Sequence, residues 1–317
     1  MQYLVILLDD TAVSFCHYDV PWEKRRPISL QTLRKGIRFA MTENLMIQFV
    51  YPDYDLPKNI QEEIETIDHS NIYSASFSQK VKVDVVVLDG WDNIRPIQNA
   101  PLVLRTTKKE FFEKYERIKD VLIEVPRVNV VITDVETFSE VDFTEYERVL
   151  LDLSDHVKQL CLKGKFPQLN LLTDRLFLRD MNNCGAGDTT ITLAPNGKFY
   201  VCPAFYYDEL VETERKENVG GLELGFGIKN KQLYQIDHAP ICRHCDAYQC
   251  KRCVWLNRKT TLEVNTPSHE QCVVAHIERK ASRKLLLDLR KHGNFFPEQP
   301  LIQELDYLDP IEKVKNL

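Results

Sequence analysis

The sequence of 317 residues contains no long hydrophobic segment. No run approaches the roughly 18 apolar residues that a helix needs to span a bilayer. The apolar run near the start, Tyr3–Leu8, is six residues long and ends at Asp9 and Asp10. A secretory signal has a longer apolar segment that follows positive charge. We therefore expect a cytoplasmic protein with no membrane partner.

Positive charge is also scarce, since the formal net charge is −6 and no basic arm occurs. The field of such a chain does not attract nucleic acid, so we expect no nucleic-acid partner. One basic stretch near the C-terminus comprises Arg279, Lys280, Arg283, Lys284, Arg290 and Lys291. We interpret it as a solvated helix face, with a docking surface for an acidic peptide or partner as the alternative.

The motifs of several enzyme classes are missing as well. None of the patterns GxSxG, HExxH and GxxxxGK[ST] occurs. Asp9 and Asp10 follow the first expected strand, where sites of parallel α/β proteins form, although capping of the loop is the ordinary role of such residues. His244 stands between two cysteines and could donate a hydrogen bond to a neighbouring ligand, or simply be exposed. No catalytic residue is assigned.

The first part of the chain alternates β-rich runs with helical segments. Strands are expected at Tyr3–Leu8, Met46–Tyr51, Val83–Leu88, Pro101–Arg105, Val128–Thr133 and Leu169–Leu172. Helices are expected at Leu30–Thr42, Lys58–Ile67, Lys108–Val121 and within Phe143–Leu162. Strands separated by such helices predict right-handed crossovers and a mostly parallel sheet. About six units are too few for an eight-fold barrel, so the α/β fold is a partial, open barrel or a doubly wound sheet.

After Leu178 glycine, asparagine and cysteine become frequent. Thr189–Leu193 and Lys198–Val201 flank the Asn196-Gly197 step, which predicts a β-hairpin because this step accepts positive φ. A polar stretch, Asp208–Asn218, follows the hairpin.

A helix over Val273–Lys291 is expected to close this cysteine-rich region. The chain is therefore expected to comprise three parts. These are an α/β partial barrel over residues 1–178, a cysteine-rich domain with its closing helix over 179–292, and a C-terminal tail over 293–317, which is weakly structured from Pro297 onward.

Nine cysteines in a reducing compartment favour metal binding over disulfides. Only Cys16 and Cys161 precede residue 184, and Cys161 is expected to be structural. The other seven crowd into 89 residues and are Cys184, Cys202, Cys242, Cys245, Cys250, Cys253 and Cys272. Thiolates are the ligands that soft metals and iron–sulfur clusters select, so these seven are the candidate metal ligands.

Two metals remain possible for this set. Zinc ribbons place their two cysteine pairs further apart than Cys245 and Cys250. Four cysteines within twelve residues are more typical of iron–sulfur ligation, in which neighbouring cysteines serve different clusters. Two [4Fe–4S] clusters need up to eight ligands, so one iron is left open or takes a non-cysteine ligand. We expect two such clusters, with zinc as the alternative.

The order of these cysteines resembles the SPASM domain, the auxiliary-cluster module of radical SAM peptide maturases. The resemblance covers roughly Cys184–Lys284 and includes the segments ITLAPNGKFYVCP, GIKNKQLYQI and CRHCDAYQCKRC. The family usually has one residue more between Cys245 and Cys250, and one more between Cys250 and Cys253. The resemblance implies one cluster bound by Cys242, Cys245, Cys250 and Cys272. It implies a second held by Cys184, Cys202 and Cys253, with one position open.

The radical SAM motif Cys-x3-Cys-x2-Cys is absent from the loop after the first strand. Cys16 fits its third position, but the other two are Asp9, a hard oxygen donor, and Val13, which has no ligand atom. The glycine-rich segment that contacts S-adenosylmethionine (AdoMet) is replaced by Tyr51-Pro52-Asp53-Tyr54. The resemblance therefore implies a degenerate radical SAM barrel without AdoMet. Cys16 is interpreted as a buried small hydrophobe, with a ligand or redox thiol as the alternative.

Over its whole length the chain resembles the SPASM-bearing CXXX repeat peptide maturases, through YLVILLDDTAVSFCHY and ENLMIQFVYPDY. These proteins are associated with ribosomal peptides rich in spaced cysteines. The resemblance implies that the clusters bind a cysteine-rich precursor peptide or relay electrons, with or beside a radical SAM enzyme. An open iron could also ligate a substrate thiolate. The alternatives are a non-catalytic scaffold that presents the precursor and a zinc-stabilised regulatory module, so enzymatic activity is left open.

Overall fold

The computed structural model describes residues 1–76, 83–91, 100–181, 184–212, 214 and 216–303. The chain forms two compact units. The first consists of Met1–Asp89 and Cys184–Gln235, and the second of Gly90–Asn183 and Ile236–Leu317. Each unit therefore contains residues from both sides of the boundary predicted at residue 178. That the residues after 178 form a separate cofactor domain stays a prediction.

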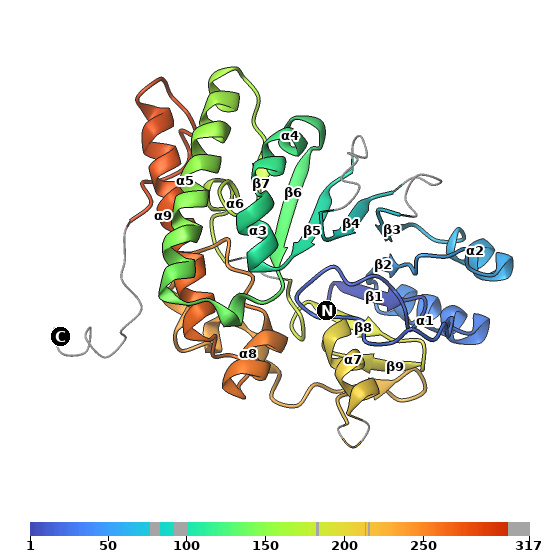
Figure 1. Cartoon of the computed structure of the whole chain (residues 1–317). Helices are drawn as coiled ribbons and strands as arrows, with labels where there is room; N and C mark the ends of the chain where they lie inside the picture. The colour runs from blue at the N-terminus through green and yellow to red at the C-terminus, as the bar shows by residue number, and fades with distance from the viewer. Residues whose placement is uncertain (77–82, 92–99, 182–183, 213, 215, 304–317) are drawn as a thin grey trace. The chain divides into compact units, whose positions relative to one another are not determined.

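The sheet of the first unit has the strand order β11-β10-β9-β8-β1-β2-β3-β4 (Figure 1). These strands are β1 Tyr3–Leu7, β2 Met46–Val50, β3 His69–Ser74, β4 Val85–Asp89, β8 Thr190–Leu193, β9 Lys198–Tyr200, β10 Gly220–Gly221 and β11 Gly225–Phe226. From β8 to β4 all neighbours are parallel, whereas β8 to β11 pair antiparallel. The helices of this unit are α1 Leu30–Thr42, α2 Lys58–Ile64 and α7 Pro203–Val211.

In the second unit β5, β6 and β7 pair in parallel. Their bounds are Leu102–Thr106, Arg127–Ile132 and Gln168–Leu169. The helices are α3 Lys108–Lys114, α4 Glu116–Glu124, α5 Glu140–Leu162, α6 Asp174–Phe177, α8 Val254–Thr261 and α9 His269–Arg290. The long helices α5 and α9 lie side by side (Figure 1).

Helix α1 illustrates how the sequence specifies its element. The Ser29 hydroxyl accepts a hydrogen bond from the amide of Thr32 at 3.0 Å, which caps the helix. Leu33 and Ile37 are buried in the core of the first unit. Gly36 faces β8, and a Cβ at this position would come within 2.5 Å of the Leu193 side chain. The absence of a side chain there lets the helix approach the sheet closely.

The prediction of an α/β fold with a mostly parallel sheet is confirmed. The predicted hairpin is present as β8 and β9, with Gly197 at a φ of +77°. Its first strand also pairs in parallel with β1, so the hairpin extends the sheet of the first unit. The helix predicted over Lys108–Val121 is two helices, α3 and α4, which meet at Tyr115.

The sequence does not predict β3, α6, α7, α8, β10 or β11. β3 begins with the polar residues His69, Ser70 and Asn71, which mask its strand pattern. α7 lies partly in the stretch interpreted as polar, although Pro203 at its first turn is a typical helix start.

The tail predicted to be weakly structured packs on the second unit over its described residues. Phe296 contacts Phe177 and Phe166, with ring centroids 5.4 and 6.2 Å apart. Ile302 is only 2% exposed. Residues 293–303 thus contain no helix or strand but pack against the second unit, and residues 304–317 lie outside the described residues.

Within the described chain, every helix is too short or too polar to cross a bilayer.

Candidate metal centre

The larger of two cysteine groups comprises Cys242, Cys245, Cys250 and Cys272. Helix α9 carries Cys272. Its start is fixed by a capping box, in which the amide of Gln271 donates to the Ser268 hydroxyl and the Gln271 side chain accepts from the Ser268 amide. Cys272 follows in the first turn, and His276 and Arg279 lie four and seven residues further on. Residues at this spacing share one face of a helix, so α9 presents a thiol, an imidazole and a guanidinium together.

The loop before α8 carries the other three cysteines. Cys242 to His244 form a 3-10 turn, and the amide of Cys245 donates to the Cys242 carbonyl at 3.0 Å. The amide of Ala247 points at the Cys245 sulfur, 3.4 Å away. The amide of Cys250 then donates to the Ala247 carbonyl at 2.9 Å. This chain of turns holds Cys242, Cys245 and Cys250 in one short loop, with the Ala247 amide directed at the Cys245 sulfur.

The four thiols of this group lie within electrostatic range of one another. Burial raises the pKa of Cys242, Cys250 and Cys272 to about 12. In every pair among these three and Cys245, the negative charge of one thiolate raises the pKa of the other. Buried thiols that oppose each other's ionisation are poorly satisfied alone, whereas a bound metal cation would stabilise the thiolates.

Three buried arginines surround this group, namely Arg175, Arg252 and Arg279, each less than 5% exposed. Arg279 forms an ion pair of 2.6 Å with Asp246, and Arg175 lies 3.7 Å from the same carboxylate and 4.2 Å from the Tyr248 ring centre. Burial raises the pKa of Cys245, and the positive charges of Arg279 and Arg175 oppose this rise. Arg252 likewise opposes the rise at Cys242.

Arg175 supplies a direct test of fit. Its Nε and Nη1 atoms are buried and have no hydrogen-bond partner in the described part of the chain. Orphaned donors of this kind are costly unless an acceptor is bound nearby. An anionic iron–sulfur cluster on the four thiolates would supply both negative charge and sulfide acceptors, so the residues present fit such a group.

His276 was missed by sequence reasoning. Its Nε2 atom lies 3.6 Å from the Cys245 sulfur, whereas His244, the histidine considered from the sequence, is exposed. The sequence does hold one indication, because His276 stands one helical turn after Cys272. This spacing does not reveal that His276 lies beside Cys245, because the position of Cys245 relative to the helix follows only from the fold.

A smaller cysteine group lies in the first unit. Cys202 is the N-cap of α7. Burial raises its pKa well above the usual range, the charges of Cys184 and then Cys16 raise it further, and the amide of Ala204 opposes the rise. Cys202 therefore lies within electrostatic range of Cys184 and of Cys16, and a shared cluster on these thiols stays a prediction. Cys16, interpreted from the sequence as a buried small hydrophobe, is only half-buried.

The remaining cysteines lie in the second unit. Cys253 is the N-cap of α8, and its predicted share in a cluster with Cys184 and Cys202 stays a prediction. Cys161 is buried on α5, and burial raises its pKa to about 11. None of the nine cysteines, all of which are described, forms a disulfide.

The loop after β1 does not fit an AdoMet-binding cluster. Asp9 accepts hydrogen bonds from the Thr11 amide at 2.8 Å and from the Tyr54 hydroxyl at 2.7 Å. Asp10 pairs with Arg26 at 2.5 Å. Both carboxylates are fully buried and therefore serve to fix the loop.

The segment Tyr51-Pro52-Asp53-Tyr54, which stands where a glycine-rich AdoMet contact is expected, packs against other residues of the protein. Tyr51 stacks on Tyr73 with ring centroids 4.0 Å apart, and the Arg25 guanidinium lies 4.2 Å from the centre of the Tyr54 ring. These contacts use the aromatic rings for packing within the protein.

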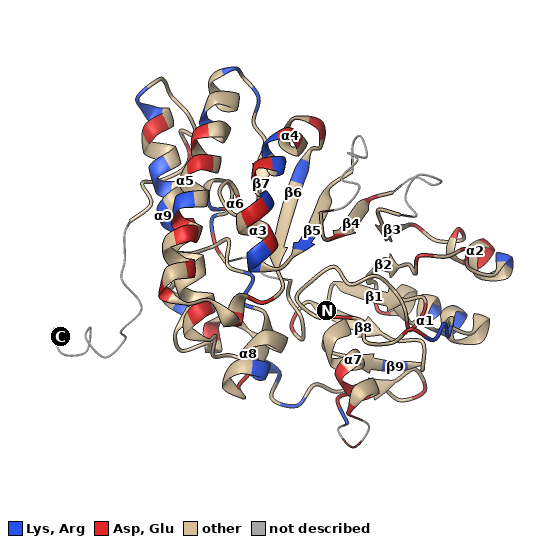
Figure 2. Ribbon diagram, viewed as in Figure 1, with Lys and Arg blue, Asp and Glu red and all other residues tan. Residues whose placement is uncertain are grey.

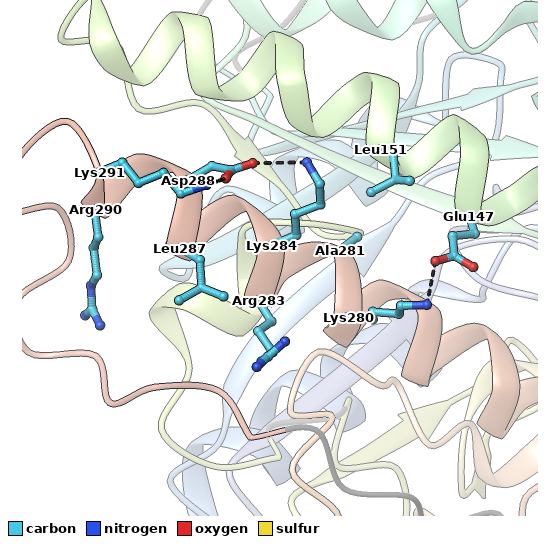
Figure 3. A pocket seen from close by; sticks show the side chains of 10 residues that line it. All are labelled: Glu147, Leu151, Lys280, Ala281, Arg283, Lys284, Leu287, Asp288, Arg290 and Lys291. Carbon is cyan, nitrogen blue, oxygen red and sulfur yellow. Dashed lines mark hydrogen bonds and ion pairs between the residues drawn. The ribbon is translucent and has the colours of Figure 1, made fainter.

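The basic stretch on α9 is largely neutralised. A groove of about 770 Å³ between α5 and α9 is lined partly by these residues (Figure 3). Lys280 pairs with Glu147 at 2.7 Å, and Lys284 and Lys291 both pair with Asp288. Figure 2 shows acidic and basic residues interspersed along both helices. This pattern favours the solvated helix face over a strongly basic docking surface for the residues from Lys280 onward, whereas Arg279 is buried.

The parallel βα sheet and the cysteine-rich region define the class: the chain has the fold of radical SAM enzymes that carry a SPASM-type region. AdoMet-bound anSMEcpe matches with a TM-score of 0.58 and 13% identity, over 92% of this chain and 99% of that chain. Streptococcus suis SuiB, bound to its precursor peptide SuiA, matches with a TM-score of 0.51 and 14% identity, over 84% and 75%. At these identities the likeness establishes the fold. No protein-family model and no curated protein matches the sequence.

Proposed function

We propose that this protein holds two [4Fe–4S] clusters and acts in the maturation of a ribosomally made, cysteine-rich peptide. The observation that carries the proposal is the gathering of Cys242, Cys245, Cys250 and Cys272 beside buried arginines. The predicted ligands of the second cluster are Cys184, Cys202 and Cys253. A cytoplasmic, reducing location would keep these thiols available.

Peptide binding is supported by the fold. SuiB was solved with its precursor peptide SuiA, and anSMEcpe with the Cp18Cys peptide at a TM-score of 0.57 to this chain. We infer a peptide with regularly spaced cysteines as the partner, because its thiols suit a site rich in iron and sulfur.

The proposal assigns AdoMet cleavage to a second protein. Asp9 and Val13 stand where two cluster-binding thiolates are needed, and Asp9 is committed to Thr11 and Tyr54. A radical SAM enzyme acting beside this chain would then perform the radical step, while this chain binds the peptide or relays electrons.

A bound [4Fe–4S] cluster would supply reversible one-electron transfer. The protein residues around Cys245 tune the site. The Ala247 amide and the His276 imidazole are placed to donate to its sulfur, and the guanidinium groups of Arg175 and Arg279 favour its thiolate. Such donors and positive charges stabilise the reduced, more negative state of a cluster.

The peptide role is tested by binding. Anaerobically reconstituted protein is titrated with a synthetic peptide of Cys-x-x-x repeats and with the same peptide carrying serine for cysteine, followed by fluorescence anisotropy. We expect saturable binding of the cysteine peptide and weaker binding of the serine peptide. Equal or absent binding of both peptides would remove the basis for the proposed substrate.

A non-catalytic scaffold is the second candidate, and the packed loop after β1 favours it. Variants that lack Cys184 or Cys202 separate the two roles. If they fold and still support maturation by the partner enzyme, the second cluster is dispensable and the chain acts as a scaffold. If maturation stops while peptide binding persists, a redox role is supported.

A further inference from the structure

The loop that follows β1 is fixed on helix α7. The ring of Tyr18 stacks on that of Tyr207, with centroids 5.5 Å apart and planes inclined by 19°. The Tyr207 hydroxyl donates to the Ala12 carbonyl at 3.2 Å, and the Ser14 hydroxyl donates to the Tyr18 carbonyl. Both tyrosines are buried. The short segment between Ser14 and Tyr18, which contains Cys16, therefore has a defined place beside α7.

Helix α7 begins at the residue after Cys202, and the turn that carries Cys184 is equally well fixed. The Thr190 hydroxyl donates to the Cys184 carbonyl at 2.9 Å. The next residue, Gly185, has a φ of +63°, and a Cβ there would overlap the Thr189 side chain. The backbone thus dictates the direction of approach of both cysteines.

Cys184 and Cys16 both lie within electrostatic range of the Cys202 thiol. Tyr18, which stacks on Tyr207 of α7, lies within the same range of Cys16 and Cys202. A ring nitrogen also lies beside this group, since the Nδ1 atom of His17 is 3.5 Å from the Cys16 sulfur.

Cys16 alone cannot hold an AdoMet-binding cluster, because Asp9 and Val13 occupy the two other ligand positions of the Cys-x3-Cys-x2-Cys motif. We propose that Cys16 is instead a ligand of the cluster held by Cys184 and Cys202, and that it fills the iron position left open by the seven downstream cysteines. This inference rests on the proposed function only in requiring that the second cluster exists.

The assignment has a consequence for the substrate. An iron that already carries the Cys16 thiolate cannot take a substrate thiolate unless Cys16 leaves. Direct ligation of the peptide at this iron is therefore excluded while Cys16 is bound, and the second cluster is left with an electron-relay or structural role.

The test compares Cys16→Ala with Cys161→Ala, which removes a buried cysteine outside both groups. The full-length proteins are reconstituted anaerobically with ferrous iron and sulfide, and iron, sulfide and the electron paramagnetic resonance spectrum after reduction are measured. We expect Cys16→Ala to lose one cluster signal, or to convert it to a three-iron signal, with the Cys161→Ala protein unchanged. Cys16→Ser, which keeps an oxygen donor, should retain the iron with a shifted signal. An unchanged Cys16→Ala spectrum and iron content would overturn the assignment.

Alkylation of the wild-type protein keeps the test decisive if Cys16→Ala fails to fold. Cys16 should lose its reactivity toward iodoacetamide in the reconstituted protein and regain it after chelation, as read by mass spectrometry. Equal labelling in both states would refute ligation. If the wild-type protein itself takes up no iron and sulfide, the proposed function fails as well. If it takes up two clusters and only the Cys16 results are negative, this inference fails alone.

Discussion

At the scale of single residues, the site depends on ion pairs between residues that lie far apart in the sequence. Arg175 and Arg279 come from α6 and α9 and converge on Asp246, the residue after Cys245. The seven downstream cysteines could be found by spacing alone. The arginines could not, because their roles follow from a burial that only the tertiary structure defines. The same reason hid His276.

Removal of Arg279 should be costly. Replacing it by leucine leaves the Asp246 carboxylate largely buried with only the more distant Arg175, so we expect the free energy of unfolding to fall by about 2–3 kcal/mol. Urea unfolding of the metal-free protein measures this. The double variant Arg279→Leu/Asp246→Leu should recover part of the loss, and a double variant less stable than the single one would contradict the explanation.

Glu278 gives the second unit a pH-dependent stability. Burial raises its pKa from 4.5 to about 7, although the Tyr146 hydroxyl donates to it at 2.7 Å. Below pH 4.5 the carboxyl is neutral in both the folded and unfolded states. Between about pH 4.5 and pH 7 the carboxyl is ionised in the unfolded chain but still largely protonated in the folded one, so stability falls by at most about 3 kcal/mol and then levels off above pH 7.

The Glu278→Gln variant should therefore lack this fall. Unfolding in urea at pH 5.5 and pH 8 should show a smaller difference for the variant than for the wild type. Glu147→Gln, which alters an exposed pair with Lys280, is the control and should behave as the wild type. A wild type whose stability rises between these pH values would contradict the assigned direction.

At the scale of elements, α9 and α7 position the cysteines. The closing helix was predicted from its apolar spacing over Val273–Lys291, but its true start at His269 comes from the Ser268 cap. This earlier start places Cys272 inside the helix rather than before it. α7 was missed because its apolar residues, Phe205 to Tyr207, lack a helical period that a single sequence reveals.

The cap predicts a coupling between α9 and metal retention. Ser268→Ala should destabilise the protein by about 1 kcal/mol and speed the loss of iron to a chelator. Ser139→Ala, in the capping box of α5, is the matched control. It should cost similar stability without affecting iron release, because α5 carries no predicted ligand. Equal iron release from the two variants would show that the Ser268 cap does not position Cys272.

At the scale of the whole molecule, the chain keeps the fold of radical SAM enzymes and replaces the residues of the AdoMet end. The alternation of strands and helices was sufficient to predict this α/β class. The division of the chain into two units could not be predicted from the sequence. Because β8 pairs with β1, residues far apart in the sequence belong to the same unit.

The residues of the loop after β1 lead to a negative prediction. Reconstituted and reduced protein should neither bind AdoMet in equilibrium dialysis nor cleave it, because Asp9 and Val13 cannot complete the motif. The fully buried Asp9 is held by Thr11 and Tyr54, so restoring both cysteines is not expected to be neutral for stability. Reductive cleavage of AdoMet by the chain alone would contradict the degenerate barrel.

Metal analysis decides whether the cysteine sulfurs bind iron clusters. Iron, acid-labile sulfide and zinc are counted in protein purified and reconstituted without oxygen. We expect about eight iron and about eight sulfide per chain, four of each per cluster, and a reducible four-iron signal. About one zinc with no sulfide would contradict this expectation.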